Sequence, residues 1–268
     1  MTFGSAIPRT VCGHAAIWSA TTGAPDAPHV VLVHGSLDRS AGLLKLSRRL
    51  DDRFRVTRFD RRGYGRSRPH PGPFGMAQQV EDLVEVVRRA DPVVAPVLIL
   101  GHSYGGNVAL ATADRHPDLV AGVIAFESPL SWLPWWPGTG AGGSAMAWQH
   151  DPEEAAERFM RRLIGDDRWD RLPPSTRAAR RAEGPAMIGE LTDLRQRPPW
   201  NAQRVRVPVL ALHGEHGQEH HRSGTEALVK MLPNATFGTL PGARHFGPNT
   251  HPDDLAEFVF GFADRLGL

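Results

Sequence analysis

A serine in the middle of the chain has the neighbours that a reactive hydroxyl requires. Ser103 lies in LILGHSYGG (residues 98–106), where a strand-like apolar run leads into Gly-x-Ser-x-Gly and small helix-forming residues follow. A sharp strand-to-helix turn would lift the hydroxyl above a sheet, and it needs glycine at 101 and 105 because a Cβ there would collide with backbone. The helix start would present N–H groups to a developing negative charge. A structural serine in a tight turn is the alternative, but the flanking strand and helix favour a nucleophile.

A serine hydroxyl becomes a strong nucleophile beside a general base, and imidazole is well suited to that task. The chain has 13 histidines, so residue type alone selects none of them. His245, in PGARHF (241–246), is the one expected between the last strand and the last helix, whereas His251 is expected to begin that helix. Position therefore favours His245 as the base.

Alternating strands and helices must position these residues. Short apolar runs predict strands at residues 29–35, 54–60, 96–103, 119–128, 207–214 and 235–242. Apolar residues at helical spacing, or runs of small residues, predict helices at residues 40–50, 76–90, 107–116 and 253–266. This alternation predicts a mainly parallel sheet with its site at the carboxyl ends of the strands.

Composition narrows the possible partners and surroundings. The 268 residues carry a net charge of +2 with basic and acidic residues interleaved, so nucleic acid is not an expected partner. Cys12, in a strand-like segment, is the only cysteine and excludes an internal disulfide. We find neither a secretory signal nor an apolar run long enough to span a bilayer, and we expect a cytoplasmic protein.

Residues 129–202 interrupt the alternation and are expected to form a cap (lid) subdomain on a core made of residues 1–128 and 203–268. This stretch contains two helical-looking pieces, a glycine-rich loop, proline pairs and six of the seven tryptophans. Trp132, Trp135 and Trp136 are candidates to line an apolar acyl pocket. Equally, they could simply pack the cap onto the core.

Four motifs, in order along the chain, resemble those of the α/β-hydrolase family. They are HGS (34–36), FDRRGYGRS (59–67), GHSYGG (101–106) and PGARHF (241–246). The resemblance implies a mainly parallel eight-stranded sheet flanked by helices, with the cap inserted between the strands at 119–128 and 207–214. It also implies an oxyanion hole formed by the backbone N–H groups of Ser36 and Tyr104.

The acid that should orient His245 is where the sequence departs from the family pattern. The usual aspartate follows the strand at 207–214, but the matching position here is Gly217. Glu127, at the end of the preceding strand, could reach the same imidazole, as a glutamate does in the similar haloalkane dehalogenases. We therefore favour Glu127, with Glu215 and Glu219 as alternatives.

Three further polar groups receive simpler interpretations. The histidines at 213, 216, 220 and 221, with Glu215 and Glu219, are interpreted as an exposed polar loop, and no metal is expected there. Asp38 and Arg39 could contact a polar substrate group. The residues Asp60, Arg61 and Arg62 are expected to pin the turn after their strand.

These residues together predict a serine hydrolase that cleaves a carboxylic ester through an acyl-enzyme, without a cofactor. The substrate is expected to be a small molecule with an apolar acyl group. The same triad could act on a C–C bond, a lactone or an amide, or as a perhydrolase, and a non-catalytic ligand-binding protein is a third interpretation. Epoxide hydrolase and dehalogenase chemistry are disfavoured because they need an aspartate at position 103.

Overall fold

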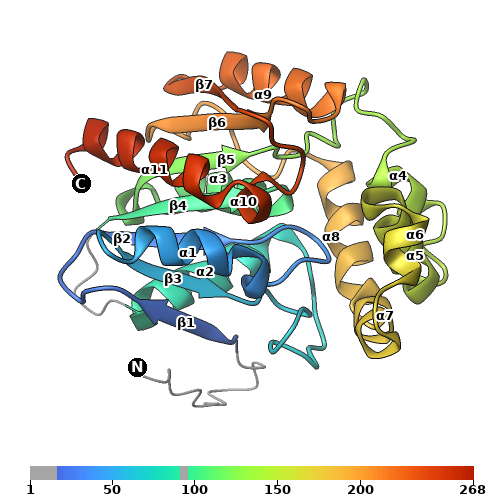
Figure 1. Cartoon of the computed structure of the whole chain (residues 1–268). Helices are drawn as coiled ribbons and strands as arrows, with labels where there is room; N and C mark the ends of the chain where they lie inside the picture. Colours follow the sequence, from blue (N-terminus) through green and yellow to red (C-terminus); the bar gives the residue numbers. More distant parts are fainter. Residues whose placement is uncertain (1–16, 91–95) are drawn as a thin grey trace.

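A computed structural model describes residues 17–90 and 96–268, and its centre is a seven-stranded sheet (Figure 1). The strand order is β1-β3-β2-β4-β5-β6-β7, and only β1 runs antiparallel to its neighbour. The strands are β1 (Ser19–Thr22), β2 (His29–Val33), β3 (Arg55–Phe59), β4 (Val97–His102), β5 (Val120–Phe126), β6 (Val209–Gly214) and β7 (Ala235–Leu240).

Helices cover both faces of this sheet. One face carries α1 (Leu44–Leu50), which follows a 3-10 turn at Ser40–Leu43, together with α10 (Gly247–Thr250) and α11 (Pro252–Leu266). The other carries α2 (Met76–Ala90), α3 (Tyr104–Arg115) and α9 (Glu219–Met231); a second 3-10 turn spans Pro117–Leu119.

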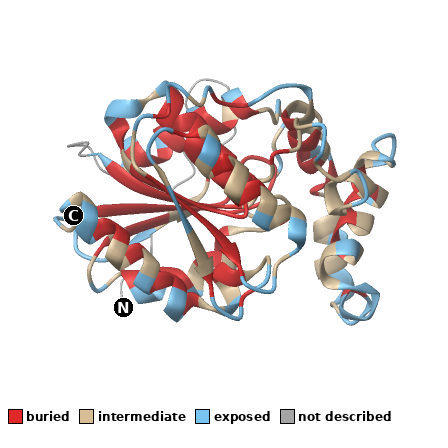
Figure 2. Cartoon of the chain, turned by 90° about the horizontal axis from the view of Figure 1, so that it is seen from above, coloured by how far each residue is buried: buried red, intermediate tan, exposed pale blue. Residues whose placement is uncertain are grey.

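The central strands are apolar on both faces because helices bury both. Val31 and Ile99 belong to the core beneath α2 and α3, whereas Leu32 and Leu100, one residue further along, belong to the core beneath α11. Figure 2 shows these strands buried along nearly their whole length. Such burial fixes the register of the strands, so the residues that follow them are held in place.

Five helices form an insertion between β5 and β6, at the end of the sheet where the parallel strands terminate (Figure 1). They are α4 (Ala141–Met146), α5 (Pro152–Ile164), α6 (Asp166–Asp170), α7 (Pro174–Arg181) and α8 (Gly184–Gln196). This cap has an apolar core of its own that includes Phe159, Trp169 and Met187, and Leu37 and Tyr64 of the sheet domain pack into it.

The predicted elements are confirmed in outline, with four differences. The described residues form seven strands, not eight, and the strand-like segment around Cys12 lies outside them. Strand β1 was not predicted. Helix α9 was not predicted, and its first three residues fall in the stretch that was interpreted as an exposed polar loop. The cap has five helices where two pieces were expected.

Within the described residues, none of the helices combines the length and the apolar character that crossing a membrane would require.

Candidate functional site

Ser103 occupies the predicted turn between β4 and α3. Its φ of 54° and ψ of −123° place its backbone in a region that residues other than glycine seldom adopt. The glycines on either side are required sterically: a Cβ on Gly101 would overlap the carbonyl of Gly105, and a Cβ on Gly105 would overlap that of Val33. The turn is therefore held tightly against the sheet, as the motif predicted.

Three residues other than glycine have positive φ within the described chain, and all three follow neighbouring strands. Leu37 (φ 53°) comes after β2, Ser103 after β4 and Glu127 (φ 47°) after β5. Such conformations cost on the order of 1–3 kcal/mol each and persist only where the surrounding structure imposes them. The strain is thus gathered beyond the carboxyl ends of three neighbouring parallel strands.

Glu127 reaches the imidazole that the sequence singled out. Its Oε2 accepts a hydrogen bond from Nδ1 of His245 at 2.6 Å, and its Oε1 accepts one from the backbone N–H of Gly214 at 2.9 Å. The carboxylate is completely buried. Burial alone would raise the pKa of Glu127, but the imidazoles of His221 and His245 outweigh it and bring the pKa far below its usual 4.5. Glu127 is therefore ionised and fixes the orientation of the His245 ring.

The alternative acids are engaged elsewhere. Glu215 accepts a hydrogen bond from the backbone N–H of Gly242 at 2.8 Å. Glu219 lies in the first turn of α9, where the Ser223 hydroxyl donates to it at 3.4 Å. Of the three carboxylates considered from the sequence, Glu127 is the one that the structure brings to His245.

Gly217, the position where the family pattern has its aspartate, lies against Glu127. A Cβ on Gly217 would come within 2.5 Å of Glu127 Oε1 and 2.9 Å of the Gly214 carbonyl oxygen. The space that an aspartate would fill is taken by the glutamate from the adjacent strand. The glycine at position 217 thus leaves room for the Glu127 carboxylate.

A second histidine, His221, also approaches Glu127, and the sequence did not predict it. Its Nδ1 lies 2.7 Å from Glu127 Oε2, but off the line that a good hydrogen bond needs. Its ring stacks on that of His245, with centroids 4.5 Å apart. Desolvation and the neighbouring His245 lower the pKa of His221. The apolar residues late in α9 could have indicated the helix, but not the contact between His221 and Glu127.

The exposed-loop interpretation of the polar stretch is therefore wrong in part. His216 and Glu215 are exposed, but His213 lies in β6 in a buried position, where its Nε2 pairs with the Thr239 hydroxyl at 2.9 Å. The remaining histidine, His220, packs edge-on against Trp136 of the cap segment at 5.1 Å.

His102, the residue before the nucleophile, joins the Ser103 turn to the loop that carries His245. Its Nε2 lies 2.8 Å from the His245 carbonyl oxygen, to which it donates. Complete burial, helped by the neighbouring His245, lowers the pKa of His102 to about 3. The ring is therefore neutral, with its proton on Nε2, and it positions the His245 backbone.

The two predicted oxyanion donors flank the serine. Tyr104 begins α3, directly after Ser103. Ser36 follows β2, where the preceding Gly35 passes so close that a Cβ there would lie 3.0 Å from Ser103 Cβ. The Ser36 hydroxyl donates to Glu190 of α8 at 2.7 Å, so the loop is tied to the cap.

Glu190 is the centre of a buried polar cluster that fastens the cap to the sheet domain. It pairs with the completely buried Arg61 and accepts hydrogen bonds from Tyr64 at 2.8 Å and Gln79 at 3.0 Å, in addition to Ser36. Arg61 therefore does more than pin its own turn.

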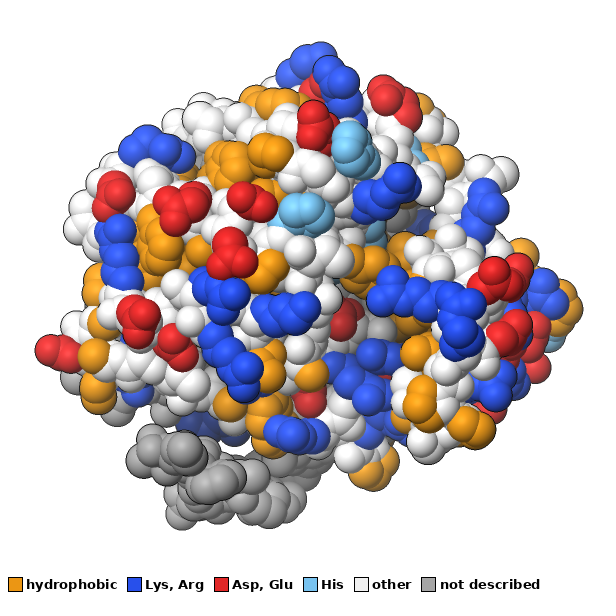
Figure 3. Space-filling model, viewed as in Figure 1, with side chains coloured by type: hydrophobic (Ala, Val, Ile, Leu, Met, Phe, Trp, Pro, Cys, Tyr) orange, Lys and Arg blue, Asp and Glu red, His pale blue; other side chains and the backbone are white. Residues whose placement is uncertain are grey.

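Glu183, also in the cap, takes a similar part nearby. It pairs with Arg39 at 2.7 Å and Arg180 at 3.2 Å, and it accepts from the Gly65 N–H at 3.0 Å. Arg39, considered above for a polar substrate group, is engaged by this carboxylate. Figure 3 shows Lys and Arg side chains gathered along the junction of cap and sheet domain.

The three tryptophans of the predicted acyl pocket have different surroundings. Trp132 packs edge-on against Trp200 at 5.5 Å, and Trp135 is 48% exposed. Trp136 lies beside His221, with ring centroids 6.2 Å apart, and so has a ring contact with a residue that approaches Glu127.

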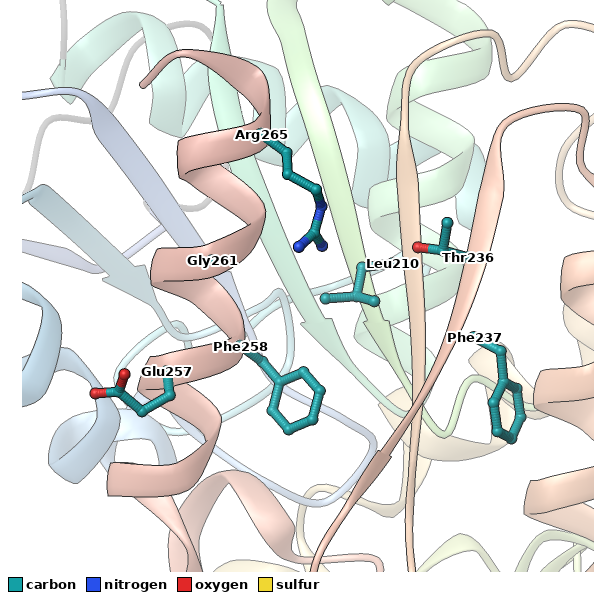
Figure 4. Close-up of a pocket in the computed structure, with 7 residues that line it drawn as sticks. All are labelled: Leu210, Thr236, Phe237, Glu257, Phe258, Gly261 and Arg265. Atoms are coloured by element: carbon teal, nitrogen blue, oxygen red, sulfur yellow. The ribbon is translucent and has the colours of Figure 1, made fainter.

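Two hollows in the described surface lie away from Ser103. One, of about 440 Å³, is formed by the first halves of β6 and β7 and by α11, and Figure 4 shows Phe237 and Phe258 on its walls. The other, of about 480 Å³, lies between the start of α2, the end of α3 and residues 193–201. Neither contains a residue of the cluster around Glu127.

Comparison with known proteins agrees with this architecture. The sequence profile of the alpha/beta hydrolase family matches residues 30–258. A 2-(acetamidomethylene)succinate hydrolase from Mesorhizobium japonicum is 24% identical, and the alignment covers 88% of each chain.

Among solved structures, a malate-bound thermophilic esterase from Thermogutta terrifontis superposes with a TM-score of 0.73 at 22% identity, covering 93% of each chain. An enol-lactonase from Burkholderia xenovorans superposes with a TM-score of 0.69, also at 22% identity, covering 92% of this chain and 96% of the other. Because the family profile spans most of the chain, including the strand ends that carry Ser103 and Glu127, the protein belongs to the α/β hydrolase family.

Proposed function

We propose that the protein is a serine hydrolase that cleaves a carboxylic ester, with Ser103 as nucleophile, His245 as base and Glu127 as acid. The observation that carries the proposal is the 2.6 Å hydrogen bond from His245 to the buried Glu127, beside a strained serine. A carboxylate placed in this way holds the imidazole in the tautomer whose Nε2 is free to accept a proton.

The reaction divides into two half-reactions. The Ser103 oxygen attacks the ester carbonyl carbon while its proton passes to Nε2 of His245, and the carbonyl electron pair moves onto oxygen. The N–H groups of Ser36 and Tyr104 stabilise that oxyanion, each by on the order of 3 kcal/mol. The C–O bond to the alcohol then breaks, and the alcohol leaves with the proton from His245. Water repeats the sequence on the acyl-enzyme, releasing the acid and free Ser103.

The proposed substrate is a small ester whose acyl group lies near Trp136, the aromatic side chain beside His221. The solved relatives include an esterase and an enol-lactonase, and a lactone is an internal ester that the same atoms could open. A non-catalytic role is less well supported, because a dead scaffold has no need of an ionised carboxylate aimed at His245.

The test is hydrolysis of p-nitrophenyl esters of increasing chain length, with simple lactones measured beside them. Wild type should be active, Ser103→Ala inactive, and Ser175→Ala, which removes an exposed hydroxyl in α7, fully active. A fluorophosphonate probe should label wild type and fail to label Ser103→Ala. Absence of both turnover and labelling in wild type would contradict the proposal.

A further inference from the structure

Glu127, His221 and His245 lie close together, and all three side chains can bind metals. The proposed catalytic mechanism uses Glu127 and His245 but has no role for His221. Glu127 follows β5, His221 lies in α9 and His245 lies in the loop after β7. One ligand atom from each lies within 4.8 Å of the others. Glu127 Oε2 is the shared point, 2.6 Å from His245 Nδ1 and 2.7 Å from His221 Nδ1.

The Nδ1 atom of His221 is the feature that the hydrolytic mechanism leaves unused. It is buried and faces Glu127 Oε2 at 2.7 Å, where a protonated ring would form an ion pair, but the direction of approach is poor for a hydrogen bond. A buried polar atom without a partner is unfavourable and calls for an explanation. A bound cation would supply the missing partner and would also balance the buried negative charge of Glu127.

We propose that Glu127, His221 and His245 bind a zinc-like divalent ion, and that the bound ion inhibits the hydrolase. Two imidazoles and one carboxylate form a ligand set that zinc uses, with a water molecule in the fourth position. Magnesium and calcium, which prefer ligand sets made of oxygen atoms, do not suit it.

The fit requires a small rearrangement. Tetrahedral ligands at zinc distances lie about 3.3 Å apart, so the two contacts of Glu127 would have to lengthen by about 0.6 Å. Rotation of the His221 ring can lengthen the His221 contact, whereas the His245 contact lengthens only if the Glu127 carboxylate or the His245 ring also moves.

Inhibition follows from where the proton of His245 must go. A neutral imidazole carries one proton, and a metal on Nδ1 leaves it only Nε2. The Nε2 atom then donates a hydrogen bond and cannot take the proton of Ser103. The proton moves from one ring nitrogen to the other, so metal binding changes neither the charge of the ring nor the proton count. This inhibition rests on the proposed function, whereas the binding does not.

The experiment measures Zn²⁺ binding to full-length Ser103→Ala by calorimetry, with the visible absorption of bound Co²⁺ as a second signal. One ion per chain is expected. Adding His221→Ala should weaken binding at least about 100-fold, beyond what loss of an outer-shell partner costs. Adding His216→Ala, which removes an exposed histidine from the same segment, should leave it unchanged. If His221→Ala does not fold, judged by circular dichroism, His221→Asn replaces it.

Failure of Ser103→Ala to bind Zn²⁺, or equal affinity after His221→Ala, would overturn the site. Zn²⁺ should also suppress wild-type ester hydrolysis, and a chelator should restore it; binding without suppression would overturn the inhibitory role. Because Ser103→Ala is inactive by design, its binding is independent of hydrolysis. A wild type that binds the ion but neither turns over esters nor reacts with the phosphonate would therefore count against the proposed function alone.

Discussion

The carboxylate of Glu127 occupies the space that a side chain on Gly217 would need. A Cβ at position 217 would lie 2.5 Å from Glu127 Oε1. In this chain a side chain at position 217, after β6, would therefore compete with Glu127, after β5, for the same space.

We expect Gly217→Asp to be inactive on its own and to be rescued in part by Glu127→Gly. The double variant removes the collision and restores a carboxylate near His245, and glycine accepts the positive φ at position 127 without strain. Its kcat/KM for a p-nitrophenyl ester should exceed that of Glu127→Gly by about 10-fold or more, within the roughly 10⁴-fold that orienting carboxylates contribute. Equal rates for these two variants would show that the positions are not interchangeable.

Glu127→Gln is expected to lower kcat by about 10⁴-fold while the protein stays folded, because the amide can hold the wrong tautomer of His245. Glu219→Gln provides the matched control, since that carboxylate is on the same side of the molecule but contacts Ser223. It should keep a kcat near that of wild type. The assignment of Glu127 would be wrong if the two variants exchanged these behaviours in a steady-state ester assay.

Glu190→Gln should destabilise the protein by about 3 kcal/mol, because it leaves the completely buried Arg61 without its anionic partner. Urea unfolding monitored by tryptophan fluorescence gives the free energy. Glu226→Gln breaks an exposed pair with Arg222 one helical turn away and should cost less than about 0.5 kcal/mol. If both variants lowered the free energy of unfolding by similar amounts, the buried cluster would not be what stabilises the contact between cap and sheet domain.

Stability should fall as the solution is acidified, and His102 should account for part of that fall. Its pKa is about 3 in the folded protein and near 6.5 once exposed. Above pH 6.5 neither state is protonated at this ring, so it contributes nothing. Between pH 6.5 and 3 the unfolded chain binds a proton that the folded protein does not, which lowers the unfolding free energy by up to about 1.4 kcal/mol per pH unit.

The variant His102→Gln lacks this titration and should lose less stability than wild type between pH 7 and pH 4. Urea unfolding of both proteins at several pH values measures the difference. Parallel decline of the two curves would mean that His102 does not stay neutral on folding.

The residues that the sequence singled out, and that the structure brings close together, are those with strong local signals. Ser103 is marked by five consecutive residues, and His245 by its place between the last strand and helix. Glu127 could be inferred because Gly217 removed the usual alternative. His221 could not, because its contact with Glu127 depends on how α9 packs against β6 and β7, and nothing in its own neighbourhood indicates burial. Glu190 was equally hidden, since its partner Arg61 lies 129 residues earlier.

Leu37, Ser103 and Glu127 also set a limit on how this protein could be engineered. Relief of positive φ at a single site can return on the order of 1–3 kcal/mol, a large share of the 5–15 kcal/mol that keeps an ordinary domain folded. Glycine at 103 or 127 would relax the backbone while deleting the proposed nucleophile or its acid. Directed evolution that selects for thermostability alone would thus favour more stable but inactive variants. Any thermostability screen on this chain should therefore also select for turnover at every round.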